Sequence, residues 1–250
     1  MTSDTWRPLG APTGGTVAGL AVVGETVYAA TPAGIRRSVD GGRTWGIAGE
    51  RMPVPFANVV AAADQHVVYA GGREGAYRSV DRGDTWHQVL SGGNVLAVAA
   101  ASGQVLLAGT EADGVLRSED GGRTWSSANP GLLELTILAL ALSPAFERDG
   151  VAFAATASGL YRSRNGGRSW RAVDPGADEP AVQALAVLKE GLVLAGTEDH
   201  GLLVSRDMGT SWQAGTLAGH GVTALAVSAE GAIAAATESG VLLSHDGGLS

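Results

Sequence analysis

Carboxylates recur at one place in a repeated pattern along this chain of 250 residues, which makes them the first candidates for acid–base chemistry. Each stands two residues after a serine: Asp40, Asp81, Asp120, Asp207 and Asp246, with Asn165 at the equivalent position of another copy. Serine and aspartate beside a tight bend also accept hydrogen bonds from backbone amides that the turn leaves unpaired. Asparagine serves that second purpose but lacks the ionisable carboxyl group that acid–base catalysis requires. The pattern therefore favours structural residues over catalytic ones.

These carboxylates belong to a motif here called the box, which reads Ser-x-Asp-x-Gly-x-Thr/Ser-Trp. Its copies occupy residues 38–45, 79–86, 118–125, 163–170, 205–212 and 244–250. They open with Ser38, Ser79, Ser118, Ser163, Ser205 and Ser244, and all but the last copy close with a tryptophan, namely Trp45, Trp86, Trp125, Trp170 and Trp212. Glycine supplies the positive φ that a tight bend requires, and the buried indole is expected to anchor the outgoing strand.

A second set of acids lies in the hairpins expected at the opposite, box-free end of each repeat. These acids are Glu74, Glu111, Asp113, Glu198, Asp199 and Glu238. A glycosidase needs two carboxyl groups about 5–10 Å apart around the scissile bond, and such a pair is available here. Acids in hairpin turns are usually only solvated, however, and no long insertion is present to build a substrate cleft. We therefore predict no catalytic residue.

Two histidines, His200 and His220, fall in loops at the same end, where Asp199 or Glu198 could join them around a metal ion. No His-x-x-His or His-Glu-x-x-His spacing supports such a site. The Gly-Gly pairs of the boxes precede strands and not helices, so they offer no helix N-terminus to a phosphate. The sequence predicts neither a metal nor a cofactor.

The elements that must position these residues are short strands. In the third repeat two apolar runs, 95–100 and 105–110, are followed by a short strand at 115–118, the box, and a strand that begins at Thr124-Trp125. The apolar runs lack polar alternation, so both of their faces are expected to be buried. The opening serines stand 39 to 45 residues apart. Four antiparallel strands in a repeat of about 40 residues are typical of a propeller blade.

We therefore expect a single all-β domain over residues 1–250, a six-bladed β-propeller of four-stranded antiparallel blades. Trp6 stands in the register of the box tryptophans, so we expect Thr5-Trp6 to supply the outer strand of the last blade. A strand exchanged in this way would hide the edges that an open array exposes. The alternative is that Trp6 is unrelated to the repeat and that the chain is part of a longer propeller.

Composition narrows the range of partners. The net charge of -8 argues against nucleic acid and anionic membrane surfaces, since both require a basic face. No apolar run approaches the roughly 20 residues of a membrane span, and the first residues lack the basic and apolar regions of a secretory signal. We expect a cytoplasmic protein without membrane insertion. Cysteine is absent, which excludes disulfides and thiolate metal sites.

The box resembles the Asp-box, or BNR, repeat of sialidases, sortilin-type receptors, xyloglucan hydrolases and photosystem II assembly factors. The resemblance covers essentially the whole chain and implies a β-propeller, but it is poorly specific for activity. In those families the box lies opposite the ligand-binding face, which implies a structural role for the box residues. A sialidase site needs three converging arginines. The nearest match to the family's Arg-Ile-Pro signature is Arg51-Met52-Pro53, and the box-free loops otherwise offer only Arg73.

We therefore expect a non-catalytic scaffold that binds a protein partner, preferably a basic one, through its box-free end. The candidate residues of that surface are Arg51, Phe56, Arg73, Glu111, Asp113, Glu198, Asp199, His200 and His220. Phe146, in the longest connection, either packs at a blade edge or serves as an exposed anchor for a partner. The alternative function is binding or hydrolysis of glycans, as a lectin or a glycoside hydrolase, although only Phe56 is placed to stack on a sugar.

Overall fold

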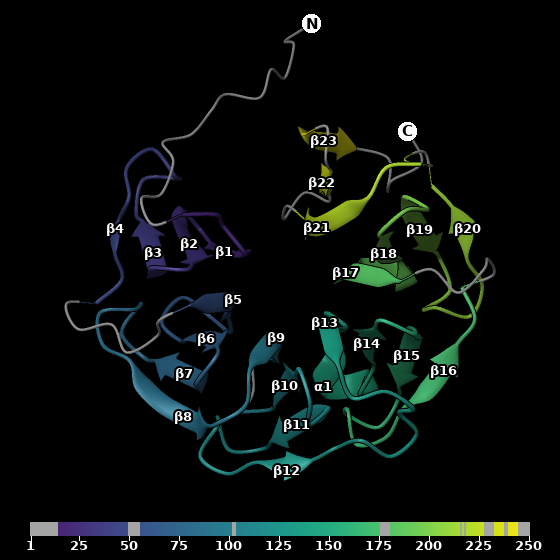
Figure 1. Cartoon of the computed structure of the whole chain (residues 1–250), viewed down its shortest axis with the longest axis horizontal. Helices are drawn as coiled ribbons and strands as arrows, with labels where there is room; N and C mark the ends of the chain where they lie inside the picture. Colours follow the sequence, from purple (N-terminus) through teal and green to yellow (C-terminus); the bar gives the residue numbers. More distant parts are fainter. Residues whose placement is uncertain are drawn as a thin grey trace, which may run out of the picture. The chain divides into compact units, whose positions relative to one another are not determined.

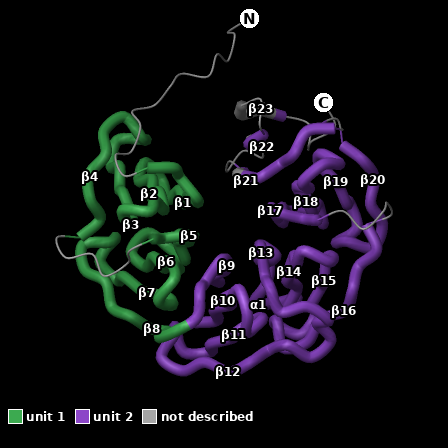
Figure 2. Tube along the Cα trace, in the orientation of Figure 1, with its two compact units in different colours: residues 1–92 green, residues 93–250 purple. Residues whose placement is uncertain are grey.

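The structure is a computed structural model that describes residues 15–49, 56–101, 104–175, 181–215, 217, 219–227, 233–237 and 240–244. The chain divides into two compact units, residues 1–92 and residues 93–250, which Figure 2 distinguishes by colour. The described elements are strands apart from one short helix, α1 (Phe146–Asp149), and one 3-10 turn, η1 (Lys189–Gly191). Among the described residues, no helix is long and apolar enough to cross a membrane.

The first unit contains two antiparallel sheets of four strands, and each sheet follows chain order. The first sheet consists of β1 (Gly19–Val23), β2 (Thr26–Thr31), β3 (Gly34–Ser38) and β4 (Gly46–Ile47). The second consists of β5 (Ala57–Ala62), β6 (Val68–Gly72), β7 (Gly75–Ser79) and β8 (His87–Ser91). Both sheets contribute to one core, in which Tyr28, Val60 and Trp86 are buried together.

The second unit contains three further sheets of four antiparallel strands and one of three. The third blade comprises β9 (Val95–Ala100), β10 (Leu106–Thr110), β11 (Val115–Ser118) and β12 (Ser126–Ser127). The fourth comprises β13 (Ile137–Leu142), β14 (Ala152–Thr156), β15 (Gly159–Ser163) and β16 (Arg171–Val173). The fifth comprises β17 (Val182–Val187), β18 (Val193–Thr197), β19 (Leu202–Ser205) and β20 (Gln213–Ala214). The three-stranded sheet comprises β21 (Val222–Val227), β22 (Ile233–Thr237) and β23 (Gly240–Ser244).

Small residues allow neighbouring blades to pack closely. The second strands of the blades, β6, β10, β14 and β18, are buried along their whole length, as their unbroken apolar runs predict. Within the second unit the inner strands β9, β13, β17 and β21 contact one another in succession (Figure 1). A Cβ added to Gly109 would lie 2.5 Å from Ile137 Cγ2, and one added to Gly196 would lie 2.7 Å from Val222 Cγ1. Only glycine fits at these two contacts between blades.

The prediction of six four-stranded blades is wrong, because the described part of the chain forms five four-stranded blades and one three-stranded sheet, β21–β23. In each four-stranded blade the outer strand begins directly after the box tryptophan. Among the described residues, no further strand pairs with β23. The expected substitute, Thr5-Trp6, lies outside the described residues, as does Asp246.

Each blade has two ends of different character. At the box end, the residue after the box aspartate or asparagine donates its backbone N–H to the connection between the first and second strands. These pairs are Gly41 to Glu25, Arg82 to His66, Gly121 to Gln104, Gly166 to Gly150 and Met208 to Gly191. The box-free end carries the hairpin between the second and third strands, together with the connection that enters the blade.

The longest connection lies at the box end of the fourth blade and contains α1. The ring of Phe146 is only 6% exposed and packs into the same core as Trp170. The interpretation of Phe146 as an exposed anchor for a partner is therefore wrong, and its role is to pack at the blade edge.

Candidate functional site

The box turns are closed by their own side chains. In the first box Ser38 Oγ accepts the N–H of Gly42 at 2.8 Å and donates to Asp40 Oδ1 at 2.7 Å. Asp40 in turn accepts the N–H of Thr44 at 2.9 Å and its hydroxyl at 2.7 Å. The same four bonds occur in the boxes of Ser79 and Asp81, Ser118 and Asp120, and Ser205 and Asp207. Both oxygens of each carboxylate are engaged within its own turn.

These bonds hold the carboxylates in the ionised form. The hydroxyl and the amide of Thr124 lower the pKa of Asp120 to about 2. At Asp81 burial raises the pKa, but hydrogen bonds from the threonine four residues on outweigh it and leave the pKa at about 2. The corresponding bonds keep the pKa of Asp40 and the pKa of Asp207 well below the ordinary value. A carboxyl group that is ionised at neutral pH in this way is poorly suited to act as a general acid.

The fourth box keeps this geometry without the charge. Asn165 Oδ1 accepts the hydroxyl of Ser163 at 2.9 Å and the N–H of Ser169 at 3.0 Å. Its Nδ2 donates to Ser169 Oγ at 2.8 Å, in the place where the other boxes have a hydroxyl donating to a carboxylate. The turn therefore needs the acceptor pattern of the side chain and not its negative charge.

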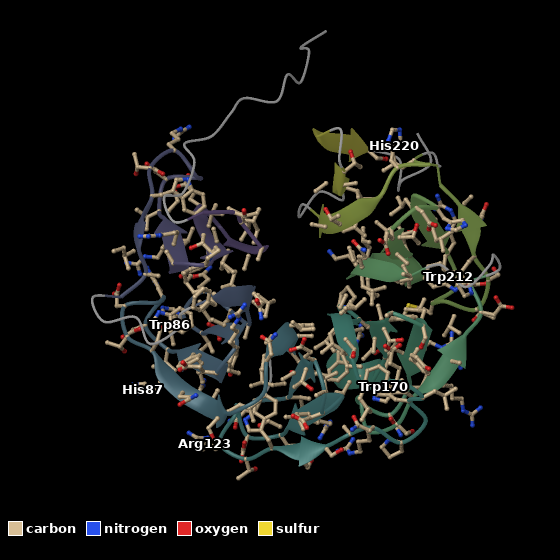
Figure 3. All side chains as sticks on the ribbon, in the orientation of Figure 1. Trp86, His87, Arg123, Trp170, Trp212 and His220 are labelled. Carbon is tan, nitrogen blue, oxygen red and sulfur yellow. The ribbon has the colours of Figure 1, made fainter. Side chains whose placement is uncertain are left out.

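The box tryptophans differ in what their indole N–H groups bind. Trp86 Nε1 donates to the carbonyl of Ala48 at 3.1 Å, and Trp170 Nε1 donates to the carbonyl of Ala128 at 2.8 Å, in each case a residue of the preceding blade. Figure 3 shows Trp170 among the side chains of the packed sheets, whereas Arg123 lies at an outer edge. In the described part of the chain Trp212 Nε1 has no hydrogen-bond partner, and Trp6 lies outside that part. Trp86 and Trp170 therefore join blades as well as closing turns.

The arginine that precedes a box serine reaches the next blade. Arg37 donates to the carbonyl of Arg82 at 2.6 Å, and Arg117 Nε donates to the carbonyl of Gly166 at 2.6 Å. Arg162 makes the equivalent bond to Met208 at 2.5 Å. Each carbonyl belongs to the residue directly after the box aspartate or asparagine. These three arginines are therefore distributed one to a blade and do not converge as a sialidase site would require.

The candidate residues at the box-free end of the second unit form two groups. In the third blade the hairpin is tied to the incoming connections, because Asn94 Nδ2 donates to Glu111 Oε2 at 3.1 Å and Thr136 Oγ1 donates to the carbonyl of Glu111 at 2.9 Å. The side chains of Glu111 and Asp113 are exposed. The structure thus places this predicted pair of carboxylates on one solvent-facing hairpin.

The second group lies in the fifth blade. His200 Nδ1 lies 2.5 Å from Asp199 Oδ1, and the side chains of Glu198 and His220 are exposed. The carbonyl of Glu198 lies 2.5 Å from the Cβ that a side chain at Gly221 would place there, so the hairpin and the loop of His220 are in close contact. Among the described residues, no three His, Asp or Glu side chains gather in a way that could hold a metal ion.

In the first unit the structure brings two of the candidates together. The guanidinium Cζ of Arg73 lies 4.8 Å from the ring centroid of Phe56, within the range of a cation–π contact. Phe56 is 49% exposed and adopts φ 54, and its N–H is held by the carbonyl of Pro32 at 3.1 Å. Arg51 lies outside the described residues.

Sequence reasoning missed two leucines at the box-free end. Leu133 is 90% exposed and Leu135 is 40% exposed, in the connection between the third and fourth blades. Between them Glu134 Oε2 accepts the N–H of Ser158, in the hairpin of the fourth blade, at 2.8 Å. The available signal was the run Leu132-Leu133-Glu134-Leu135, in which successive apolar residues follow a Pro-Gly turn outside any strand.

No family model and no curated protein matches the sequence. Among solved structures the chain is similar to YCF48 bound to D1 peptide, with 18% identity and a TM-score of 0.70 over 96% of this chain and 82% of that one. It is similar to YCF48 from Cyanidioschyzon merolae, with 15% identity and a TM-score of 0.69 over 90% and 78% of the two chains. It also matches the GH74 xyloglucanase from Xanthomonas campestris, with 19% identity and a TM-score of 0.74 over 98% of this chain and 46% of the enzyme.

These likenesses show the fold, which is an all-β propeller of four-stranded antiparallel blades. At identities below a fifth they do not carry an activity from one chain to the other. The chain spans less than half of the length of the xyloglucanase, and the enzyme's name describes the whole of that longer protein.

Proposed function

We propose that this chain is a non-catalytic scaffold whose second unit binds a basic segment of a protein partner at its box-free end. One observation carries the proposal. Among the described Asp, Glu, Lys and Arg side chains at the box-free end of the second unit, all are carboxylates. They are Glu111, Asp113, Glu134, Asp174, Glu198 and Asp199. A surface of one sign attracts a partner of the opposite sign and disfavours others.

The cations of the second unit gather at its other end. All of them lie in a box, directly beside one, or in a box-end connection: Arg117, Arg123, Arg148, Arg162, Arg164, Arg168, Arg171, Lys189 and Arg206. Because attraction between exposed charges is screened within about 10 Å at moderate salt, these cations do little to neutralise the acidic end. The box-free end of the second unit therefore keeps a negative electrostatic potential, which attracts a positively charged partner.

The exposed leucines add an apolar component to the same surface. Leu133 lies in the loop of Glu134, whose carboxylate is bound to the neighbouring hairpin. Isolated exposed leucines are common, but an apolar contact bordered by carboxylates suits a partner that presents apolar and basic residues together. The expected ligand is therefore a peptide segment with lysine or arginine beside leucine-like residues.

Two further points support a binding role over a catalytic one. The described box carboxylates accept hydrogen bonds within their own turns, which leaves them poorly suited to act as catalytic acids or bases. A propeller of similar fold, YCF48, has been solved bound to a peptide, which supports peptide binding as a use of such a scaffold.

The test is titration of the protein with two short acetylated peptides, one rich in lysine and leucine and one with glutamate in place of each lysine. We expect the basic peptide to bind and to weaken as salt is added, since exposed charges are screened. Reversing two exposed carboxylates, in the Asp113→Lys/Glu198→Lys variant, should weaken binding by about tenfold, because each exposed ion pair contributes up to about 1 kcal/mol.

Glu147→Lys/Glu190→Lys is the matched control, because it makes the same total change of charge on two exposed residues at the box end. It should bind the basic peptide as the unaltered protein does. Equal affinity for the two peptides would contradict the proposal. So would a large thermal shift with xyloglucan or sialylated oligosaccharides in a protein that ignores the basic peptide, since this result favours a glycan-active propeller.

A further inference from the structure

A pocket at the outer edge of the fourth blade is lined by three arginines and is independent of the box-free end. Its volume is about 410 Å³, and Arg162, Arg164 and Arg171 contribute to its lining together with Asn165 and Ser169. Arg162 and Arg171 come from paired positions of β15 and β16, and Arg164 is the second residue of the box. The three guanidinium groups are therefore brought to one place by the antiparallel pairing and by the turn that follows it.

The third blade has a pocket at the corresponding place and shows what is unusual about the fourth. That pocket, of about 450 Å³, is lined by Arg117, Glu119 and Ser126 among others. Glu119 stands where the fourth blade has Arg164, and Ser126 stands where it has Arg171. Both arginines at the third-blade pocket, Arg117 and Arg168, are ion-paired with Glu119. Neighbouring blades thus place a pocket with one carboxylate among its arginines and a pocket with none at equivalent positions.

The fourth blade also lacks the box carboxylate. Four other described boxes have aspartate at the position of Asn165, and that aspartate is ionised because its oxygens accept hydrogen bonds within the turn. The single replacement by asparagine therefore occurs in the box where three arginines line the pocket. Within the described part of the chain, Arg164 and Arg171 form no ion pair with a carboxylate.

The remaining neighbours leave this positive charge largely uncompensated. Arg162 is half-buried and is fixed by donating to the carbonyl of Met208 and to Thr210 Oγ1 at 3.3 Å. Burial lowers the pKa of Arg162 and the charge of Arg164 lowers it further, while Asp207 acts in the opposite direction. Both carboxylate oxygens of Asp207 accept hydrogen bonds from Ser211, within its own box. The guanidinium groups nevertheless stay charged, because arginine is not deprotonated in proteins.

We infer that this pocket binds a phosphate group. Guanidinium groups present planar pairs of donors that match phosphate oxygens, and several together suit a doubly charged tetrahedral anion better than a single carboxylate. Asn165 and Ser169 add neutral polar groups to the same wall. Nucleic acid is a poor source of the phosphate because the chain carries a net charge of -8. The source is a phosphorylated partner segment or a small phosphorylated molecule.

The experiment is calorimetric titration with inorganic phosphate, acetate, a short phosphoserine peptide and its unphosphorylated form at constant ionic strength. Phosphate and the phosphopeptide should bind, and acetate and the plain peptide should not. Tighter binding of the phosphopeptide than of phosphate identifies a protein-borne group, and equal binding identifies the free group. Failure of both phosphate-bearing probes overturns the inference.

Charge-changing variants distinguish binding by the arginines of this pocket from attraction of the anion to the overall charge of the protein. Arg164→Glu reproduces the charge arrangement of the third blade, which folds, and should weaken phosphate binding about tenfold or more, given the strength of charge-assisted hydrogen bonds. Asn165→Asp restores the carboxylate of the other boxes and should also weaken it. Arg206→Glu, at the same box position in the fifth blade, is the control and should bind as before. Equal losses in Arg164→Glu and Arg206→Glu, with unchanged melting temperatures, would mean that only the overall charge matters.

Discussion

The indole Nε1 of Trp170 donates a 2.8 Å hydrogen bond to the carbonyl of Ala128, which lies 42 residues earlier in the chain. The bond fastens the box turn of the fourth blade to the residue that follows the outer strand of the third. A motif that is local in sequence thus also holds two blades together.

Removing an indole that bonds to the preceding blade should lower the free energy of unfolding more than removing one that bonds only within its own box. Trp170 is 3% exposed, so Trp170→Ala should cost about 3–5 kcal/mol of unfolding free energy. Trp170→Phe keeps most of the burial but loses the donor to Ala128, at a cost of about 1–3 kcal/mol. Denaturant titration measures both. Trp125 is half-buried and donates within its own box to Gly122, so Trp125→Ala should cost clearly less than Trp170→Ala. Equal losses would contradict a joining role.

Acid should destabilise the protein through the box aspartates. Hydrogen bonds from Thr124 hold the pKa of Asp120 at about 2 in the folded chain, below the value of about 3.9 for an unfolded aspartate. The folded state therefore gains stability from Asp120 above about pH 4, and this gain is lost as the pH falls toward the folded pKa. Asp120→Asn should show a smaller drop in melting temperature between these pH values, since the position no longer titrates. An acid profile identical to that of the unaltered protein would contradict this account.

A methyl group added at a close contact between blades should force the blades apart and destabilise the fold. A Cβ at Gly109 would lie 2.5 Å from Ile137 Cγ2, so Gly109→Ala should cost about 1–3 kcal/mol by overpacking. Gly46 serves as the control, because a Cβ there comes no nearer than 4.0 Å to the carbonyl of Arg37. Gly46→Ala should leave the melting temperature unchanged or raise it. A neutral Gly109→Ala would show that the two blades have room to separate.

The buried arginine of the third blade should not tolerate replacement by lysine. Arg117 is 6% exposed, donates through Nε to the carbonyl of Gly166 and is ion-paired with Glu119. Lysine lacks the forked donors needed to serve both acceptors, so Arg117→Lys should cost about 1–3 kcal/mol. Arg123 is exposed and, among the described residues, donates to the carbonyl of Asp120, so Arg123→Lys should be close to neutral. Urea unfolding of the two variants makes the comparison.

Much of the architecture could be predicted because it rests on short-range patterns. Each box closes with bonds between residues two to four positions apart, such as Ser38 to Asp40 and Thr44 to Asp40. The apolar runs predicted the first two strands of each blade because no polar residue interrupts them, and the second strands β10 and β14 are buried throughout. The blade count was wrong because the sixth repeat resembles the others in sequence, yet among the described residues no fourth strand pairs with β23.

The candidate sites were harder to predict because repetition concealed them. The arginines before the box serines are similar in sequence, yet Arg117 is neutralised by Glu119 whereas Arg162 lines a pocket with two further cations. Leu133 and Phe146 both lie in connections, but the former is exposed and the latter buried. Their surroundings come from blades far away in sequence, and no local pattern reports them.

The amino-acid sequence by itself determined the turns, the strands and the acids of the box-free hairpins, because these depend on neighbours a few residues away and on residue type alone. The tertiary structure decided which side chains meet across blades. A box lies about 40 residues from its counterpart in the next blade, so the link from Trp170 to Ala128 and the gathering of three arginines beside Asn165 exist only once sheets have packed in register.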